Sequence, residues 1–204
     1  MNDNNKPDMP AQRRLHLLWA FAAAATLVSG CGGGGSSDAS GNNNGSPSPS
    51  PAPATPVLST CGLSNFSTQL LQRINTLRAA GANCGSSGTF AATGALTWNG
   101  QLTQAADGHS QDMAAANFFS HTGSNGSAFD QRISATGYKW STAGENIAAG
   151  YSSVDAVMDG WISSPGHCAN LMNPNFSEVG VSCVPGSSTT TYSSYWTMDL
   201  AKPQ

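Results

Sequence analysis

The chain has 204 residues, a formal net charge of −3 at pH 7 and only 9% charged residues. No lysine- and arginine-rich patch or stripe appears along it, which excludes the electrostatic footprint of a nucleic-acid-binding protein. Once residues 1–60 are set aside for their unusual composition, the remainder is long enough for one domain with a proper hydrophobic core.

Residues 1–30 have the pattern of a secretory signal peptide. Arg13 and Arg14 precede the apolar run LHLLWAFAAAATLVS, which is too short to span a bilayer comfortably as a permanent helix. The small residues directly before Cys31 resemble a bacterial lipobox, so we expect cleavage before Cys31 and lipidation at this cysteine. Ordinary secretion with an unmodified Cys31 is the alternative. Gly32, rather than an aspartate, follows the cysteine, which favours the outer membrane if the host has one.

Residues 31–60 contain this cysteine and a Gly-, Ser- and Pro-rich segment with almost no large apolar side chains. Burial cannot offset the entropy cost of ordering such a chain, so we expect a disordered tether. Residues 61–204 are then the folded domain, an extracytoplasmic monomer held near a membrane by the N-terminal lipid.

Four cysteines fall within residues 61–204, an even number that predicts two disulfides in an exported protein. The cysteine count leaves the connectivity open. Because the members of each pair are close in sequence, we expect Cys61–Cys84 and Cys168–Cys183.

Apolar residues at three- to four-residue spacing predict helices over residues 64–80, 101–117 and 153–161. Shorter helices are predicted at 130–137 and 167–172. His109 lies on the apolar face of the second long helix and is interpreted as a core or interface histidine.

The segments 79–100, 118–127 and 140–153 lack regular apolar spacing, are rich in turn-forming residues and are predicted to be loops. Near the C-terminus, EVGVSCV and YSSYWTMDLA alternate between apolar and polar residues and predict an antiparallel hairpin. Along residues 61–204 the predicted helices come first and the predicted strands come near the C-terminus. This order indicates an α+β fold with helices packed on a small antiparallel sheet.

Three candidate ligands or proton carriers, His121, Glu145 and His167, lie after helices or in turns, where rigid scaffolds commonly present functional side chains. Two imidazoles and a carboxylate would suit zinc, whose open sites take three protein ligands and a water. The three residues are far apart in sequence, so no local geometry brings them together. Alternatively, both histidines hydrogen-bond neighbouring loops and Glu145 accepts backbone N–H groups. Asn146 is expected to stabilise its turn through the side-chain amide.

Four blocks of the sequence resemble the bacterial branch of the CAP superfamily, the family of cysteine-rich secretory, antigen 5 and pathogenesis-related proteins. They are HSQDMAAANFFSHTGSNGS, GENIAAG, GWISSPGHCANLMNPNFSEVGVSCV and YWTMDLA, in order across about residues 66–201. The resemblance implies an α–β–α sandwich, also called the SCP domain. It also implies a cleft lined by histidines and acids, which binds a divalent metal in several members.

Carried onto this chain, the resemblance makes His121 and His167 the cleft histidines and Glu145 the glutamate of the G-E-N motif. Ser164 stands where many eukaryotic members have a further glutamate, so a metal here, zinc or another divalent ion, would rely on the two histidines. Asp159, one turn earlier, compensates only if it faces the cleft.

The resemblance favours a cell-envelope or secreted binding module without enzymatic activity, whose ligand is a lipid, a sterol-like molecule, a glycan or a peptidoglycan fragment. A hydrolase is the alternative. It would use a metal, or Ser120 or Ser164 beside a histidine and Glu145. The chain has no G-x-S-x-G motif, which weighs against a serine hydrolase.

Overall fold

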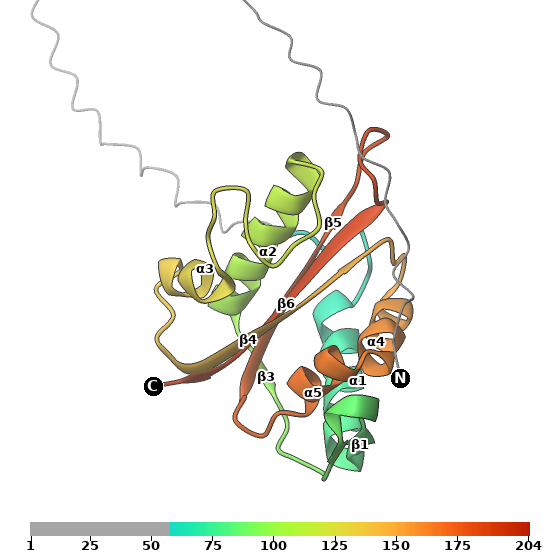
Figure 1. The fold of residues 1–204 in the computed structure, drawn as a ribbon, viewed down its shortest axis with the longest axis vertical. Helices are drawn as coiled ribbons and strands as arrows, with labels where there is room; N and C mark the ends of the chain where they lie inside the picture. The colour runs from blue at the N-terminus through green and yellow to red at the C-terminus, as the bar shows by residue number, and fades with distance from the viewer. Residues whose placement is uncertain (1–57) are drawn as a thin grey trace, which may run out of the picture. The chain divides into compact units, whose positions relative to one another are not determined.

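The computed structural model describes residues 58–204 (Figure 1). The predicted signal peptide, Cys31 and nearly all of the predicted tether lie outside these residues. The elements are α1 (Phe66–Ala80), β1 (Ala82–Asn83), η1 (Gly85–Ser87), β2 (Thr89–Phe90), β3 (Thr97–Trp98), α2 (Gly100–Ala115), α3 (Phe129–Ala135), β4 (Trp140–Ala149), α4 (Val154–Ser163), α5 (Pro165–Met172), β5 (Glu178–Pro185) and β6 (Ser194–Pro203). Among the helices of residues 58–204, none has the length and apolar character needed to cross a membrane.

The central sheet has the strand order β3-β5-β6-β4. β6 pairs antiparallel with both β5 and β4, and the short β3 pairs parallel with β5. The predicted C-terminal hairpin is therefore confirmed, and its two strands form the centre of the sheet. β4 lies at one edge, where one side of its backbone is left unpaired within this sheet.

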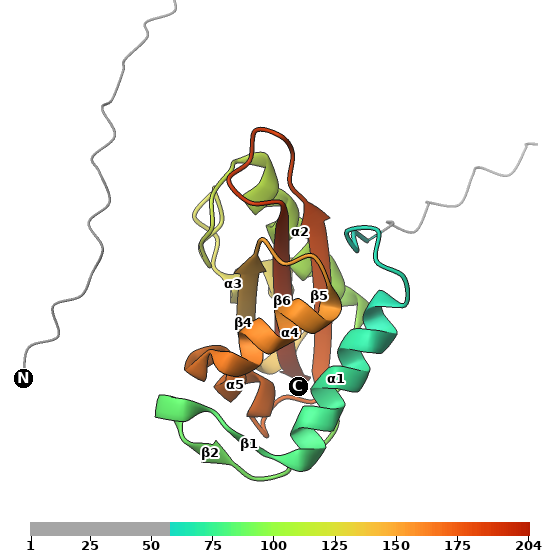
Figure 2. The same cartoon turned by 90° about the vertical axis from the view of Figure 1, so that its right-hand side faces the viewer.

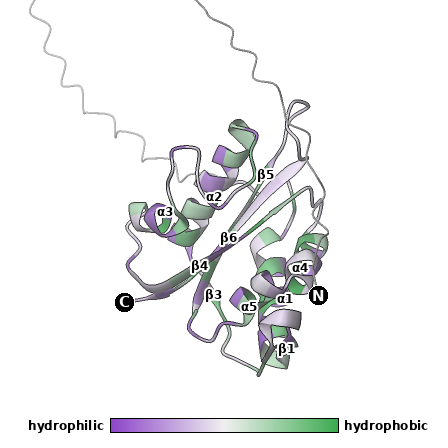
Figure 3. Cartoon of the chain, viewed as in Figure 1, coloured by the Kyte–Doolittle hydropathy of each residue, from purple (hydrophilic) through white to green (hydrophobic). Residues whose placement is uncertain are grey.

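Helices cover both faces of this sheet, as Figures 1 and 2 show. One face packs against α1, α4 and α5 in the main core, to which β6 contributes Trp196, Met198 and Leu200. The alternate residues of β6 face α2, where the Ser110 hydroxyl donates to Thr197 Oγ1 at 2.8 Å. Figure 3 shows both hydrophilic and hydrophobic residues along α2, because one side of this helix packs on the sheet and the other side is exposed. The predicted α–β–α sandwich is confirmed.

Gly180 in β5 allows α2 to lie directly on the sheet. A Cβ at this position would fall 2.7 Å from Thr103 Cα and closer still to the neighbouring backbone of α2. Backbone atoms cannot swing away as a side chain can, so only glycine fits at this crossing. The close contact fixes the height of α2, and with it His109, above β6.

The segment 140–153, predicted as a loop, contains the ten-residue edge strand β4. On the face toward α5, β4 carries small or polar residues: Gly144, Asn146 and Ala148. Gly144 makes room for Phe176, whose Cζ would lie 2.8 Å from a Cβ there. The large apolar side chain on this face comes from Phe176 and not from β4 itself. The sequence of β4 therefore shows no alternation of apolar and polar residues. The loop predicted over 79–100 likewise contains β1, η1, β2 and β3.

The predicted disulfide pairing is wrong. The bonds are Cys61–Cys183 and Cys84–Cys168, across 122 and 84 residues of sequence. The segment before α1 lies along the end of β5, where the Cys61 amide donates to the Cys183 carbonyl at 2.8 Å. Ser59 also bonds to the domain, so the ordered fold begins before Cys61. Closeness in sequence gave the wrong pairing because folding places the segment around Cys61 beside Cys183 in β5.

Non-reducing peptide mapping should recover a Cys61–Cys183 pair and a Cys84–Cys168 pair. A proteolytic digest analysed by mass spectrometry before and after reduction measures this directly. Recovery of a Cys61–Cys84 peptide from freshly purified protein would contradict the topology described above.

Candidate functional site

Glu145 is the buried centre of a hydrogen-bonded group at the sheet edge. His121 Nδ1 donates to Glu145 Oε1 at 2.7 Å, and Arg132 Nη2 donates to Glu145 Oε2 at 2.6 Å. The Glu145 side chain is 1% exposed, whereas the His121 side chain is 53% exposed. Arg132 also donates to the His121 carbonyl at 3.1 Å and so anchors the loop that carries this histidine. Both oxygens of the carboxylate are therefore used to hold His121 and α3 in place.

His167 reaches the same region from α5. Its carbonyl accepts a bond of 3.1 Å from Asn146 Nδ2, and Asn170 Nδ2 donates to Asn146 Oδ1 at 2.9 Å and to the Glu145 carbonyl at 3.2 Å. The disulfide of the next residue, Cys168, fixes the helix further. Asn146 thus links β4 to α5. The prediction that its side chain stabilises a turn is wrong.

His121 acts electrostatically on His167. Burial lowers the pKa of His167, and the neighbouring His121 lowers the pKa further, because a second positive charge nearby is unfavourable. His167 is therefore neutral at neutral pH and can donate and accept hydrogen bonds through its two ring nitrogens. Of the three residues that the sequence singled out, His121 is hydrogen-bonded to Glu145, and His167 lies close enough to His121 for its pKa to be lowered.

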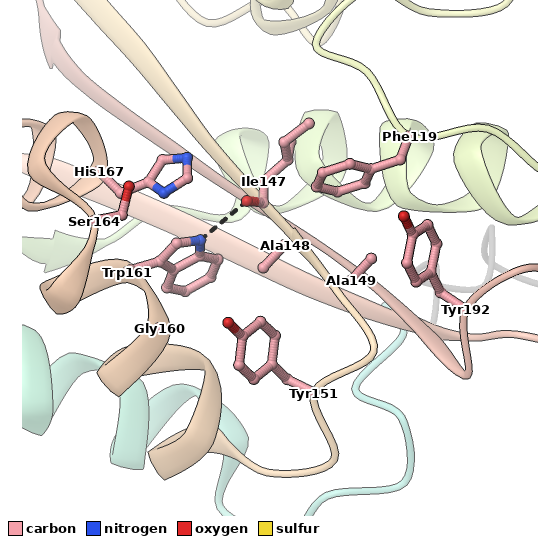
Figure 4. A pocket seen from close by; sticks show the side chains of 10 residues that line it. All are labelled: Phe119, Ile147, Ala148, Ala149, Tyr151, Gly160, Trp161, Ser164, His167 and Tyr192. Atoms are coloured by element: carbon pink, nitrogen blue, oxygen red, sulfur yellow. Dashed lines mark hydrogen bonds between the residues drawn. The ribbon is translucent and has the colours of Figure 1, made fainter. Parts of the chain in front are cut away.

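A pocket of about 300 Å³ opens beside His167 (Figure 4). Its lining residues are Phe119, Ile147, Ala148, Ala149, Tyr151, Gly160, Trp161, Ser164, His167 and Tyr192. His167 and Ser164 lie at one end and Phe119 and Tyr192 at the other, with Tyr151 and Trp161 along the side between them (Figure 4). Since the Ser164 hydroxyl does not cap α5, it is available to a ligand.

Asp159 does not replace the missing acid of the cleft. Its side chain is 70% exposed and pairs with Arg73 on the outer side of α4. Ser164 therefore lines the pocket with a neutral hydroxyl, and no Lys, Arg, Asp or Glu is among the lining residues.

The arrangement does not provide a three-ligand zinc site. Glu145 is turned away from solvent and uses both oxygens on His121 and Arg132, so it supports the His121 imidazole rather than serving as a third ligand. No group of three His, Cys, Asp or Glu side chains suited to a metal occurs within residues 58–204. His121 and His167 alone are one protein ligand short of the usual set.

A second set of buried polar groups lies behind Glu145, on the face of the sheet toward α2. Asp199 in β6 is the cross-strand partner of Glu145 and is fully buried. Neither oxygen of its carboxyl has a hydrogen-bond partner within residues 58–204. Burial raises the pKa of Asp199, the adjacent Glu145 raises it further, and Arg132 lowers it. Asp199 was not identified from the sequence, although a lone carboxylate inside an apolar strand was a signal.

His109 is fully buried, with its Nε2 atom 2.9 Å from the Ser120 carbonyl oxygen. Burial lowers its pKa, although Glu145 opposes this effect. The prediction of a core histidine is confirmed. Arg132 and Asn170 were also missed by sequence reasoning, because no local pattern marks residues whose partners lie on other elements.

The family model of the cysteine-rich secretory protein family, CAP, matches residues 71–200. Two similar proteins come from Bacillus subtilis (strain 168): YkwD, 41% identical over 91 residues, and the membrane protein YlbC, 35% identical over 86 residues. The matches cover 44% and 42% of this chain but only 35% and 25% of those proteins.

Solved structures agree with this assignment. An extracellular SCP-domain protein from Bacillus anthracis is 29% identical, with a TM-score of 0.53 over 66% of this chain and 39% of that one. An outer surface protein from Borrelia burgdorferi shares the fold at 18% identity, with a TM-score of 0.56 over 67% of this chain and 92% of that one. The family model matches more than half of the chain and the fold agrees with it, so this chain belongs to the CAP family of cysteine-rich secretory proteins.

Proposed function

We propose that this chain is an extracytoplasmic binding protein that holds a small neutral ligand in the pocket beside His167. Two disulfides support an oxidising compartment, and the B. anthracis relative is described as extracellular. Lipid on Cys31 would keep the domain near a membrane. The observation that carries the proposal is the pocket itself, which has an apolar wall, convergent polar groups at one end and no charged lining residue.

Binding is favoured over hydrolysis because the cleft lacks an activated nucleophile. The bond between His121 and Glu145 resembles the base and acid of a catalytic triad. Yet among residues 58–204 no serine or threonine hydroxyl bonds to either cleft imidazole, and the Ser120 hydroxyl accepts from the Thr122 amide at 3.1 Å. A histidine held by a carboxylate without a nucleophile is better suited to hydrogen-bonding a ligand.

Gly160→Ala is expected to weaken ligand binding about tenfold, because the new methyl group would displace a wall of the pocket. A Cβ at Gly160 would lie 2.7 Å from Tyr151 Cζ and closer still to its hydroxyl. The Tyr151 carbonyl is held by Ser194 and Trp196, so the ring has to move rather than the backbone. Binding of chitotriose and of 1-octanol, two uncharged probes, measured by titration with NMR detection, tests this in wild type and variant.

Gly108→Ala is the matched control, since Gly108 is also helical but a Cβ added there would have nothing within 4 Å. We expect it to leave binding unchanged. If neither probe binds to the lining residues of the wild-type pocket, or if both alanine variants bind equally well, the proposal fails. Turnover of a probe that disappears in His167→Ala would instead support the hydrolase alternative.

A further inference from the structure

We propose that Phe119, Tyr192 and Tyr151 form an aromatic subsite that stacks on a neutral sugar ring, so that the ligand of this pocket is a neutral glycan. This inference rests on the proposed function and specifies its ligand class. It is carried by the exposure of Phe119 and Tyr192, by the way these two rings are held, and by the polar groups at the other end of the pocket.

Phe119 and Tyr192 are the only exposed large hydrophobic side chains within residues 58–204, at 44% and 38%. Both line the same pocket. Their ring centroids are 5.7 Å apart at 60°, and Tyr192 also meets Tyr195 edge to face at 5.8 Å. Two exposed aromatic rings gathered at the rim of one pocket indicate a contact surface for a ligand rather than scattered surface residues.

The two rings are held together by Asn117, which precedes Phe119 by two residues. Its Oδ1 atom accepts bonds from the Thr191 amide at 2.7 Å and from the Tyr195 hydroxyl at 3.2 Å. Asn117 itself has a φ of 50°, which turns the chain sharply at the end of α2. The loop between β5 and β6 is thereby fastened to the segment that carries Phe119. Such a platform is ordered before the ligand arrives, which lowers the entropy cost of binding.

A pyranose ring has an apolar C–H face and a rim of hydroxyl groups, and the pocket offers a counterpart for each. Phe119 and Tyr192 lie at one end and Tyr151 lies along the side, while His167 and Ser164 lie at the other end (Figure 4). An acyl chain would leave these polar groups without partners, at a cost for each buried group. An anionic sugar or phosphate would find no cation among the lining residues.

Titration of the purified protein with chitotriose, a neutral β-linked oligosaccharide, tests the inference. Phe119→Leu and Tyr192→Leu should each weaken binding about three- to tenfold, because leucine keeps the apolar contact but removes the aromatic face. Tyr192→Phe should lose less affinity than Tyr192→Leu, since the ring remains. Trp140→Leu, which alters an aromatic residue outside this pocket, should bind as wild type does.

The outcomes separate the inference from the proposed function. If chitotriose binds equally well to the leucine variants, or if only 1-octanol binds and Gly160→Ala weakens it, the glycan inference is overturned and the binding function stands. If neither probe binds to the pocket, both fail. Thermal denaturation of the Phe119 and Tyr192 variants tests for misfolding. We expect none, because both of these side chains are exposed.

Discussion

Arg78→Met is expected to lower the free energy of unfolding by about 3–5 kcal/mol. Arg78 lies in α1 and is 1% exposed, yet no carboxylate within residues 58–204 pairs with it. Its guanidinium donates instead to four backbone carbonyls, those of Gly94, Leu171, Asn173 and Phe176, at 2.6 to 3.2 Å. Burial lowers the pKa of Arg78, but arginine stays charged at any ordinary pH.

Removing the guanidinium would leave the buried carbonyls of Leu171 and Phe176 without this donor, which costs more than the bonds themselves contribute. Leu171 lies in the last turn of α5 and Asn173 caps that helix, so the cation also compensates the negative end of the helix dipole. α5 carries His167, and Arg78 therefore orients the candidate site from a distance. We expect Arg78→Met to weaken ligand binding in addition to stability, and Arg78→Lys to recover only part of either, because an ammonium cannot span the same carbonyls.

Urea denaturation of Arg78→Met beside Arg73→Met provides the measurement. Arg73 lies on the same helix but is partly exposed and pairs with Asp155 and Asp159 at the surface. Surface pairs contribute about 0–1 kcal/mol, so Arg73→Met should change stability little. Equal losses in the two variants would show that the carbonyl contacts of Arg78 do not stabilise the fold.

The sequence contained enough information to predict the long helices and the C-terminal hairpin. Each of these elements buries one apolar face, so apolar residues recur along its sequence at the spacing of a helix or a strand. α4 illustrates this: Val154, Val157, Met158 and Trp161 are all buried. β4 was missed because Gly144 and Asn146 occupy inward positions, where a period-two pattern requires large apolar residues. Hydropathy cannot indicate a strand whose packing partner, Phe176, comes from elsewhere in the chain.

The candidate site was predicted in part for a related reason. His121, Glu145 and His167 were identified from their positions after helices or in turns, and then through short motifs that resemble a family. Neither signal gives the partners of a residue. The roles of Arg132, Asn170 and Asp199 depend on which strands are neighbours. The disulfides show the same limit, since Cys61 meets Cys183 only after the sheet has formed. Strand order is a property of the whole chain, and local spacing does not encode it.

Asp199→Asn is expected to stabilise the protein at neutral pH, which is unusual for a substitution at a fully buried position. Asp199 faces Glu145 across the β4–β6 pair. The other charged or titratable groups that interact with this cluster are Arg132, His109 and His121. Arg132 already donates to Glu145, so a second carboxylate there gains little from it. Asparagine has nearly the same shape and carries no charge.

The pH dependence follows from the raised pKa of Asp199 in the folded state. A raised pKa means that the contribution of this group is fully favourable below the unfolded-state pKa, near 3.9, and is lost as the pH rises through the folded-state value. Over that interval, wild-type stability should fall relative to Asp199→Asn by about 1.4 kcal/mol per pH unit. The difference between the two proteins should be small at pH 4 and should grow toward neutral pH.

Asp107→Asn is the control that distinguishes this effect from the general removal of a buried acid. Asp107 accepts bonds from the Ser59 amide at 2.9 Å, the Ser182 hydroxyl at 2.6 Å and Gln111 Nε2 at 2.6 Å. The NH2 group of an asparagine side chain there would face hydrogen-bond donors instead of accepting from them, so this variant should lose about 1–3 kcal/mol of stability.

Chemical denaturation of wild type, Asp199→Asn and Asp107→Asn from pH 4 to 8 gives the comparison. If Asp199→Asn instead parallels wild type at every pH, folding does not raise the pKa of Asp199. If it destabilises at neutral pH as Asp107→Asn does, Asp199 is ionised and paired in the folded protein. Glu145 would then share its face of the sheet with a second negative charge, and the hydrogen bond that holds His121 would be formed against that repulsion.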